Sequence, residues 1–248
     1  MKYHVTGVYF SPAGGTRRAV EALCSCWEGE KSFLELGVRR PEANLGREDL
    51  LVLGLPVYAD TIPDVPGLLD GLHGDETPCV VVATYGNCKY GDALAQMKKL
   101  MAERGFRCAA GIAIITPHIF APVLGSDRPD AEDMKILKDF AVQVKKKLSE
   151  NSWPEAELPG NPDPEIRHIP ALVKARDMDI CMECGHCARV CPTGAMNTMT
   201  LKWDDSKCIS CMTCVSRCPT GALSFNSAAI ANKLTAAFSE RQSISIFI

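Results

Sequence analysis

The sequence predicts an α/β protein in two parts, a doubly wound five-stranded parallel sheet followed by a small α+β domain. Over residues 1–150, short β-branched apolar runs alternate with longer helical stretches, the pattern that builds a parallel sheet covered on both faces. Over residues 175–225, one cysteine motif occurs twice at an offset of 27 residues. We therefore expect a first domain at 1–150, a linker at 151–174, a second domain at 175–225 and a tail at 226–248.

Five apolar runs are the expected strands of the first domain, at residues 4–11, 32–36, 50–57, 79–84 and 108–115. Helical stretches begin near Thr16, Pro66, Gly91 and Asp130. The last is the clearest, because apolar side chains recur there at steps of three and four residues, at Met134, Leu137, Ala141, Val144 and Leu148.

The composition changes after residue 150, where five prolines accompany scattered acids: Pro154, Pro159, Pro162, Pro164 and Pro170. Prolines at this density exclude a helix or a central strand and predict a semi-stiff linker. The tail has a helical run around Ile230, Leu234 and Phe238, followed by alternation of serine with apolar residues at 243–247. That alternation fits either an added strand or a frayed end.

Charge and cysteine usage limit the classes of function. The formal net charge of -3 over 248 residues provides no broad basic surface, so nucleic acid is not an expected partner. No apolar run reaches the roughly 18 residues of a membrane span, and the start does not read as a secretion signal. Eight of the thirteen cysteines lie in one short stretch at metal-ligand spacing, which indicates a reducing compartment. We expect a cytoplasmic protein.

Each copy of the repeat reads Cys-x-x-Cys-x-x-Cys-x-x-x-Cys-Pro-Thr-Gly-Ala. Four thiolates are what a four-iron, four-sulfide cluster requires, so two copies predict two 4Fe-4S clusters. A zinc knuckle also uses Cys-x-x-Cys pairs, but zinc takes four ligands from two pairs, whereas each run here has three evenly spaced cysteines, a fourth and a proline. The ligands are Cys181, Cys184, Cys187, Cys191, Cys208, Cys211, Cys214 and Cys218.

Residues 176–225 resemble the bacterial-type ferredoxins with two 4Fe-4S clusters, and no ligand position is missing. In that arrangement the last cysteine of each run ligates the other cluster. The resemblance therefore implies that Cys181, Cys184 and Cys187 share a cluster with Cys218, and that Cys208, Cys211 and Cys214 share one with Cys191.

A candidate phosphate site follows the first strand, where the chain reads Ser11, Pro12, Ala13, Gly14, Gly15, Thr16. The glycines let the backbone approach a ligand, and free amides at the helix start favour an anion. Two more loops follow strands at the same sheet edge, where open parallel sheets bind ligands. They contain Pro56, Val57, Tyr58 and Ala59, and then Thr84, Tyr85, Gly86, Asn87, Tyr90, Gly91 and Asp92. Their aromatic rings can stack on a planar ligand.

Together the three loops resemble the flavodoxin-like module of flavodoxin-ferredoxin fusion proteins, and the likeness covers nearly the whole chain. It implies a sheet of strand order 2-1-3-4-5 that binds FMN, with residues 11–16 on the phosphate and residues 56–59 and 84–92 on either side of the isoalloxazine. Ala13 stands where flavodoxins usually supply a threonine, which removes one hydrogen bond of about 1 kcal/mol.

FMN exchanges one or two electrons and a cubane carries one, so a chain with both is expected to be an electron-transfer flavoprotein. Neither a nicotinamide-dinucleotide fingerprint nor a nucleotide-triphosphate loop is present, so protein redox partners are expected to exchange electrons with it. Two alternatives stay open. One is a reductase of a small substrate bound over the flavin, and the other is a redox sensor whose first domain has lost FMN.

Overall fold

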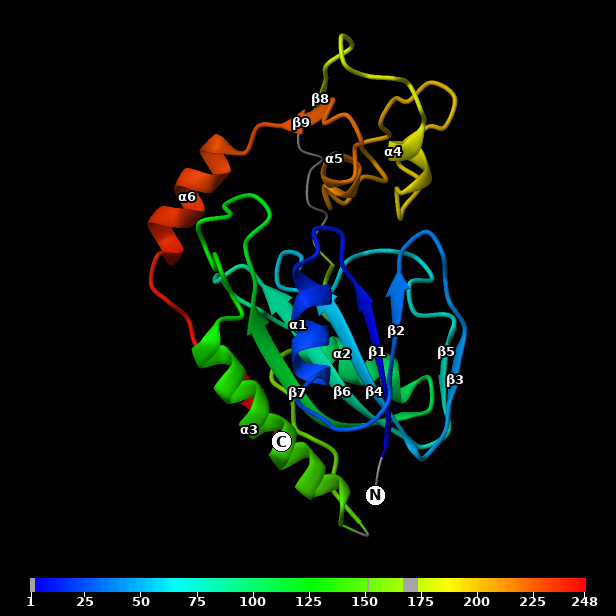
Figure 1. Ribbon diagram of the computed structural model, residues 1–248, viewed down its shortest axis with the longest axis vertical. Coiled ribbons are helices and arrows are strands. Elements are labelled where there is room, and N and C mark those ends of the chain that lie inside the picture. The colour runs from blue at the N-terminus through cyan, green and yellow to red at the C-terminus, as the bar shows by residue number, and fades with distance from the viewer. Residues whose placement is uncertain (1–2, 151, 167–173) are drawn as a thin grey trace.

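The computed structural model describes residues 3–150, 152–166 and 174–248. An α/β body forms one end of the molecule, and the cysteine-rich unit lies over the carboxyl ends of its strands (Figure 1). In the described part of the chain, no helix combines the length and the apolarity that crossing a membrane requires.

The main sheet has six strands in the order β10-β7-β6-β4-β1-β2. Five are parallel and correspond to the expected ones: β1 His4–Phe10, β2 Lys31–Leu36, β4 Asp49–Pro56, β6 Thr77–Tyr85 and β7 Phe106–Ile115. Numbered among themselves, these strands run 2-1-3-4-5, so the predicted doubly wound order is confirmed. A small second sheet, which the sequence analysis did not predict, pairs β3 Ala43–Leu45 with β5 Leu72–Gly74.

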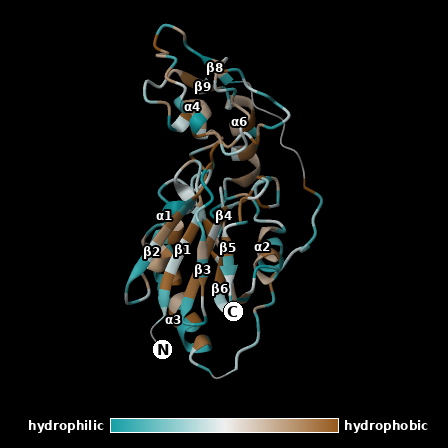
Figure 2. Cartoon of the chain, turned by 90° about the vertical axis from the view of Figure 1, so that its right-hand side faces the viewer, coloured by the Kyte–Doolittle hydropathy of each residue, from teal (hydrophilic) through white to brown (hydrophobic). Residues whose placement is uncertain are grey.

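Helices cover both faces of the sheet. α1 Gly15–Cys24 and α3 Ala131–Leu148 lie on one face and α2 Ala93–Ala102 on the other, with apolar strands between them (Figures 1 and 2). All nine residues of β6 are buried, as expected for a central strand covered on both sides. α3 begins with a capping box in which the carboxylates of Asp130 and Asp133 each accept from the other's backbone N–H.

The helix expected from Pro66 does not form; residues 66–71 make successive turns instead. Val65, Leu68, Leu69 and Leu72 are buried at helical spacing, which explains the expectation. Gly67, however, has φ +68°, a left-handed conformation that no α-helix contains. A series of turns, closed by backbone hydrogen bonds between residues three apart, carries these apolar side chains into the core. One of them is the bond from Leu68 N–H to the Val65 carbonyl (3.1 Å).

The proline-rich segment is packed on the body over part of its length. Trp153 is buried, and the Arg107 guanidinium lies 4.3 Å from its ring centre. The Ala156 N–H donates to the Cys108 carbonyl at the edge of β7 (2.9 Å), and the Asn161 N–H donates to Asp92 (2.8 Å). This part is therefore docked, in contrast to the expected tether, and the expected proline Pro170 lies outside the described residues.

The cysteine-rich unit is held by an antiparallel pair, β8 Lys174–Arg176 with β9 Leu223–Phe225, and contains the short helices α4 His186–Arg189 and α5 Thr213–Ser216. After β9, α6 Ala228–Phe238 descends along the body, and β10 Ser245–Phe247 pairs antiparallel with β7 (Figure 1). Of the two interpretations left open for the tail, the added strand is the one observed.

The returning tail is fastened by buried polar groups. The Asn87 side-chain amide donates to the carbonyls of Phe238 and Glu240 (both 2.8 Å), and its oxygen accepts from Gln242 N–H (3.0 Å). Arg128 donates to the Gln242 carbonyl (3.2 Å). The chain thus leaves the body, forms the cysteine-rich unit and returns to the same sheet.

Candidate redox site

The predicted phosphate loop lies between β1 and α1. Gly14 adopts φ +84°, and its N–H donates to the Ser11 carbonyl (3.3 Å) to close the turn. The buried Ser11 hydroxyl accepts from Arg17 N–H (2.9 Å), which leaves its own hydrogen free to donate. The first amides of a helix have no intrahelical partner, and the first turn of α1 carries no acid. The loop therefore fits an anion through its backbone and through Ser11.

The Thr16 hydroxyl, which is expected at the FMN phosphate, is bonded to another side chain of the protein. That hydroxyl is buried and bonded to the hydroxyl of Thr84 in the third loop (2.8 Å). The bond ties the phosphate loop to β6. Ala13 is exposed at the tip of the turn.

The second loop makes a tight turn beyond β4. The backbone groups of Tyr58 and Thr61 exchange two hydrogen bonds (2.7 and 3.0 Å), and the two residues between them, Ala59 and Asp60, both have positive φ. Val57 N–H donates to the Thr84 carbonyl (2.8 Å), so the turn is anchored to the third loop. This geometry presents the partly exposed Tyr58 ring at the carboxyl edge of the sheet.

The third loop is held in place by contacts with other parts of the chain. Tyr85 packs edge-on against Tyr90 with ring centres 5.6 Å apart, and burial raises the pKa of Tyr85 to about 12. Asp92 N–H donates to the Asp60 carbonyl (2.6 Å), and a Cβ on Gly91 would lie 2.3 Å from that oxygen. The side chains of Asn87 and Asp92 are used by the tail and the linker. A planar ligand at this edge would therefore meet the backbone of this loop and not these two side chains.

Four cysteines line one cavity in the second unit: Cys191, Cys208, Cys211 and Cys214. They are the four that the crossed arrangement assigns to one cluster. Cys208, Cys211 and Cys214 are at most 9% exposed, and Lys174 Nζ lies 3.1 Å from the Cys208 sulfur. Burial raises the pKa of Cys211 and, to about 11, that of Cys214.

The indole N–H of Trp203 bears on whether this cavity suits a sulfur-rich cofactor. Its indole N–H is buried and makes no hydrogen bond among the described residues, and it faces Cys214, where it favours the thiolate of that cysteine. A cavity lined by four cysteines and one unsatisfied N–H donor fits a cluster whose sulfurs accept hydrogen bonds. Trp203 lies in the spacer between the two motifs, where no sequence pattern marks it as a cluster residue.

The other four cysteines lie toward solvent. Cys184 is exposed, and Cys181, Cys187 and Cys218 are partly exposed. The pKa of Cys218 is lowered; burial opposes the change, but hydrogen bonds from Thr220 and the backbone of residues 222–223 outweigh it. Among the described residues, no three His, Cys, Asp or Glu side chains converge on a position for a single metal ion. A four-iron cluster does not need such a convergence, because each of its four cysteines binds a different iron.

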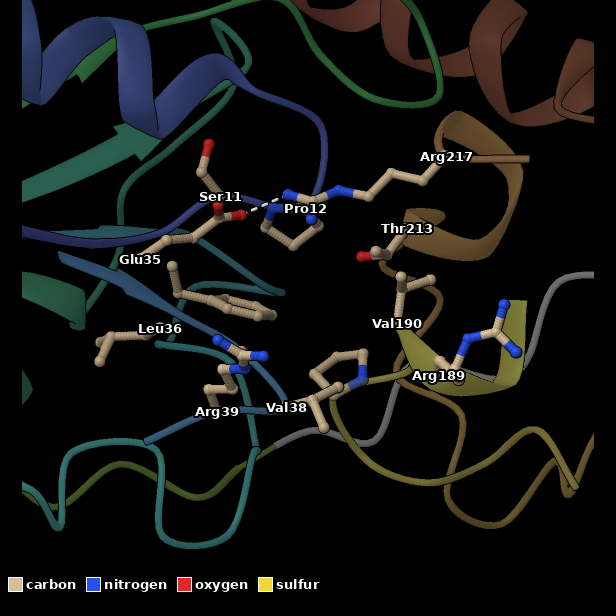
Figure 3. Close-up of a pocket in the computed structure, with 13 residues that line it drawn as sticks. Ser11, Pro12, Glu35, Leu36, Val38, Arg39, Arg189, Val190, Thr213 and Arg217 are labelled. Atoms are coloured by element: carbon tan, nitrogen blue, oxygen red, sulfur yellow. Dashed lines mark hydrogen bonds and ion pairs between the residues drawn. The ribbon is translucent and has the colours of Figure 1, made fainter. Parts of the chain in front are cut away.

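The two units meet directly at the predicted phosphate loop. Ser216 donates to the Pro12 carbonyl (3.2 Å), and Arg217 forms an ion pair with Glu35 across a cleft between the units (Figure 3). Ile209 packs against the core of the body. A second contact joins Phe120 to Phe225, with ring centres 6.0 Å apart. No local pattern in the sequence predicts these contacts.

Tyr58 of the second loop responds electrostatically to the cysteine-rich unit. Its pKa is raised well above the usual value, first by burial and then by the negative charges of Cys211 and Cys208. These two cysteines are therefore close to the second predicted flavin loop. Ile209, which stands between Cys208 and Cys211 in the sequence, packs against the core of the body, so this side of the cysteine-lined cavity faces the body.

The comparisons with known proteins address the two parts separately. Residues 174–219 match the family described as 4Fe-4S dicluster domain. No curated protein sequence is significantly similar to the chain. Similar solved structures include a putative flavoprotein from Bacteroides uniformis (15% identity, 56% of this chain and 98% of that one, TM-score 0.39). Flavodoxin 2 from Bacillus cereus is 15% identical over 58% of this chain and 99% of its own, with a TM-score of 0.42.

The class of protein follows from the strand order and the domain match. The body has the doubly wound flavodoxin-like order, and the second unit is a 4Fe-4S dicluster domain, which carries two clusters. The chain is thus an iron-sulfur protein of the electron-transfer class with a flavodoxin-like body.

Proposed function

We propose that this chain passes single electrons between its two 4Fe-4S clusters and an FMN bound at the carboxyl edge of the sheet, and onward to protein redox partners. The observation that carries the proposal is the position of the buried cysteine set. Ile209, between Cys208 and Cys211, packs against the core of the body, and both cysteines act electrostatically on Tyr58, which belongs to a loop expected to flank the flavin. A cluster in that cavity would stand between the flavin and the rest of the second unit.

The body would hold FMN mainly through its backbone. The turn at Gly14 and the amides at the start of α1 would bind the phosphate, with a donated hydrogen bond from Ser11. Residues 56–59 and 84–92 would enclose the ring, and Tyr58 would lie on the side of the second unit. When bound, FMN supplies exchange of either one or two electrons.

The order of the carriers follows from burial. The set Cys191, Cys208, Cys211 and Cys214 would hold the inner cluster beside the flavin site. The set Cys181, Cys184, Cys187 and Cys218 would hold the outer cluster, because none of its ligands is buried, whereas three ligands of the inner set are. An electron from a partner protein would enter the outer cluster, pass to the inner one and reach the flavin.

The FMN part is tested at Gly14. Gly14→Asp should weaken FMN binding by about tenfold or more, because a carboxylate is placed beside the phosphate dianion. Gly14→Asn is the matched control: asparagine has the same shape, tolerates positive φ and carries no charge. Fluorescence titration of FMN into flavin-free protein measures both dissociation constants.

Riboflavin provides the second control, because it has no phosphate to repel, and both variants should bind it equally. Equal FMN dissociation constants for the Asp and Asn variants would mean that residues 11–16 do not hold the phosphate. If the unaltered chain binds no FMN at all, the sensor alternative is favoured.

A further inference from the structure

The segment between β8 and α4 forms an exposed loop at the end of the molecule farthest from the sheet (Figure 1). It reads Asp177, Met178, Asp179, Ile180, Cys181, Met182, Glu183, Cys184. Met178, Ile180 and Met182 are 59%, 47% and 66% exposed, and the three acids are exposed as well. The loop thus surrounds two ligands of the outer cluster with apolar side chains in an acidic rim.

Backbone bonds fix this shape. Asp177 N–H donates to the Ala222 carbonyl (2.9 Å), Cys181 N–H donates to the Asp177 carbonyl (3.1 Å), and the Asp177 carboxylate accepts from Asp179 N–H (2.9 Å). The apolar side chains are therefore held outward by an ordered turn. Three neighbouring exposed apolar side chains on an ordered loop are typical of an interaction site.

The charge on this loop is almost entirely negative. Arg176 is directed inward, where it donates to the Leu201 carbonyl (2.7 Å) and lies over the Trp203 ring. Arg189 borders the loop and donates to the Cys184 carbonyl (2.9 Å). The three exposed acids of the loop would attract a basic surface.

We propose that this loop is the docking surface for a protein electron donor or acceptor whose own docking face has an apolar centre and a basic rim. The proposal rests on the proposed function, in which the outer cluster exchanges electrons with a partner. A second copy of this chain would bring the same acidic loop, and an anionic membrane would be repelled, so the charge favours a basic protein. Methionine side chains suit such a contact because they adapt to different apolar surfaces.

The test uses the holoprotein, reduced anaerobically, and cytochrome c as a basic one-electron acceptor. The double variant Asp179→Lys with Glu183→Lys reverses two rim charges and leaves Asp177, which holds the turn, unchanged. The second-order rate constant for cytochrome c reduction should fall about tenfold or more at low ionic strength. The loss should shrink as salt is added.

The matched control is Glu28→Lys with Asp139→Lys, which makes the same change in net charge at exposed positions on the body. It should change the rate less than about twofold, and both variants should reduce menadione, a small neutral quinone, at the wild-type rate. An equal loss in both variants, or no loss in the loop variant, would overturn the proposal.

Flavin reduction by the clusters is recorded in the same samples to separate the two proposals. If flavin is not reduced by the clusters in the unaltered protein, the proposed function fails, whereas the cytochrome c comparison still decides whether the loop is the docking surface. Iron and flavin contents are measured first, so that a lost cluster is not mistaken for a lost contact.

Discussion

Replacing Cys191 by Ala is expected to remove the inner cluster and to leave the outer one in place. Cys191 is the last cysteine of the first motif, but it lines the same cavity as Cys208, Cys211 and Cys214. A cubane that loses one of four thiolates is held by three and is expected to be lost or converted on isolation. Iron analysis of anaerobically isolated protein should fall from about eight irons per chain to about four.

The matched control is Cys218→Ala, which should remove the outer cluster by the same reasoning. Reaction with a thiol reagent followed by mass spectrometry distinguishes the two outcomes. Cys208, Cys211 and Cys214 should become reactive in the first variant, and Cys181, Cys184 and Cys187 in the second. If Cys191→Ala instead exposes Cys181, Cys184 and Cys187, the crossed assignment is wrong. If zinc is bound in place of iron in unaltered protein, the cluster account fails.

The second large effect is expected for Asp133→Ala, which breaks a buried ion pair. Arg128 and Asp133 are 5% and 1% exposed and form two charge-assisted hydrogen bonds. Removing the carboxylate leaves the buried guanidinium with only the more distant Asp130 carboxylate (3.7 Å) and the Gln242 carbonyl, and breaking a buried pair in this way typically costs about 3–5 kcal/mol. For a chain of this size that corresponds to a fall in the unfolding midpoint of roughly 6–20 °C. Thermal unfolding of the body, followed by circular dichroism, measures it.

Asp139→Ala is the control for Asp133→Ala, because Asp139 lies on the same helix and is exposed. Its effect should stay within about 0.5 kcal/mol. Equal midpoints for the two variants would show that the pair does not stabilise the body. Because Arg128 also donates to the Gln242 carbonyl, Asp133→Ala should additionally loosen the tail that joins the second unit to the sheet.

The strands and the cysteine motifs could be predicted because their signals are local. β6 contains a continuous apolar run, and the spacing of the cysteines in each motif can be read directly from the sequence. The false helix at Pro66 shows where local periodicity fails. Val65, Leu68, Leu69 and Leu72 have helical spacing and are buried, but one left-handed glycine turns the chain. Periodicity records which side chains are buried and not the backbone path that buries them.

The contacts between the units could not be predicted, since each joins residues far apart in sequence. Asn87 was assigned to the flavin from its place in a loop, yet its amide binds carbonyls about 150 residues later. Ser216 and Pro12 are separated by 204 positions. Nothing in the local sequence marks such pairs. Their consequence is that the second unit is fixed to the body by its direct contacts at Ser216 and Arg217 and by the tail that ends in β10.

This fixed arrangement is the basis of the central claim, that electrons pass between the inner cluster and the flavin within one chain. The most direct measurement is stopped-flow spectroscopy of the FMN-loaded protein after rapid reduction of the clusters by a low-potential donor. Carriers held together in one chain react at a rate that does not depend on dilution. We expect the rate of flavin reduction to stay constant over a tenfold range of protein concentration and to be lost in Cys191→Ala. A rate proportional to protein concentration would contradict the account, because the flavin would then receive electrons only from other molecules.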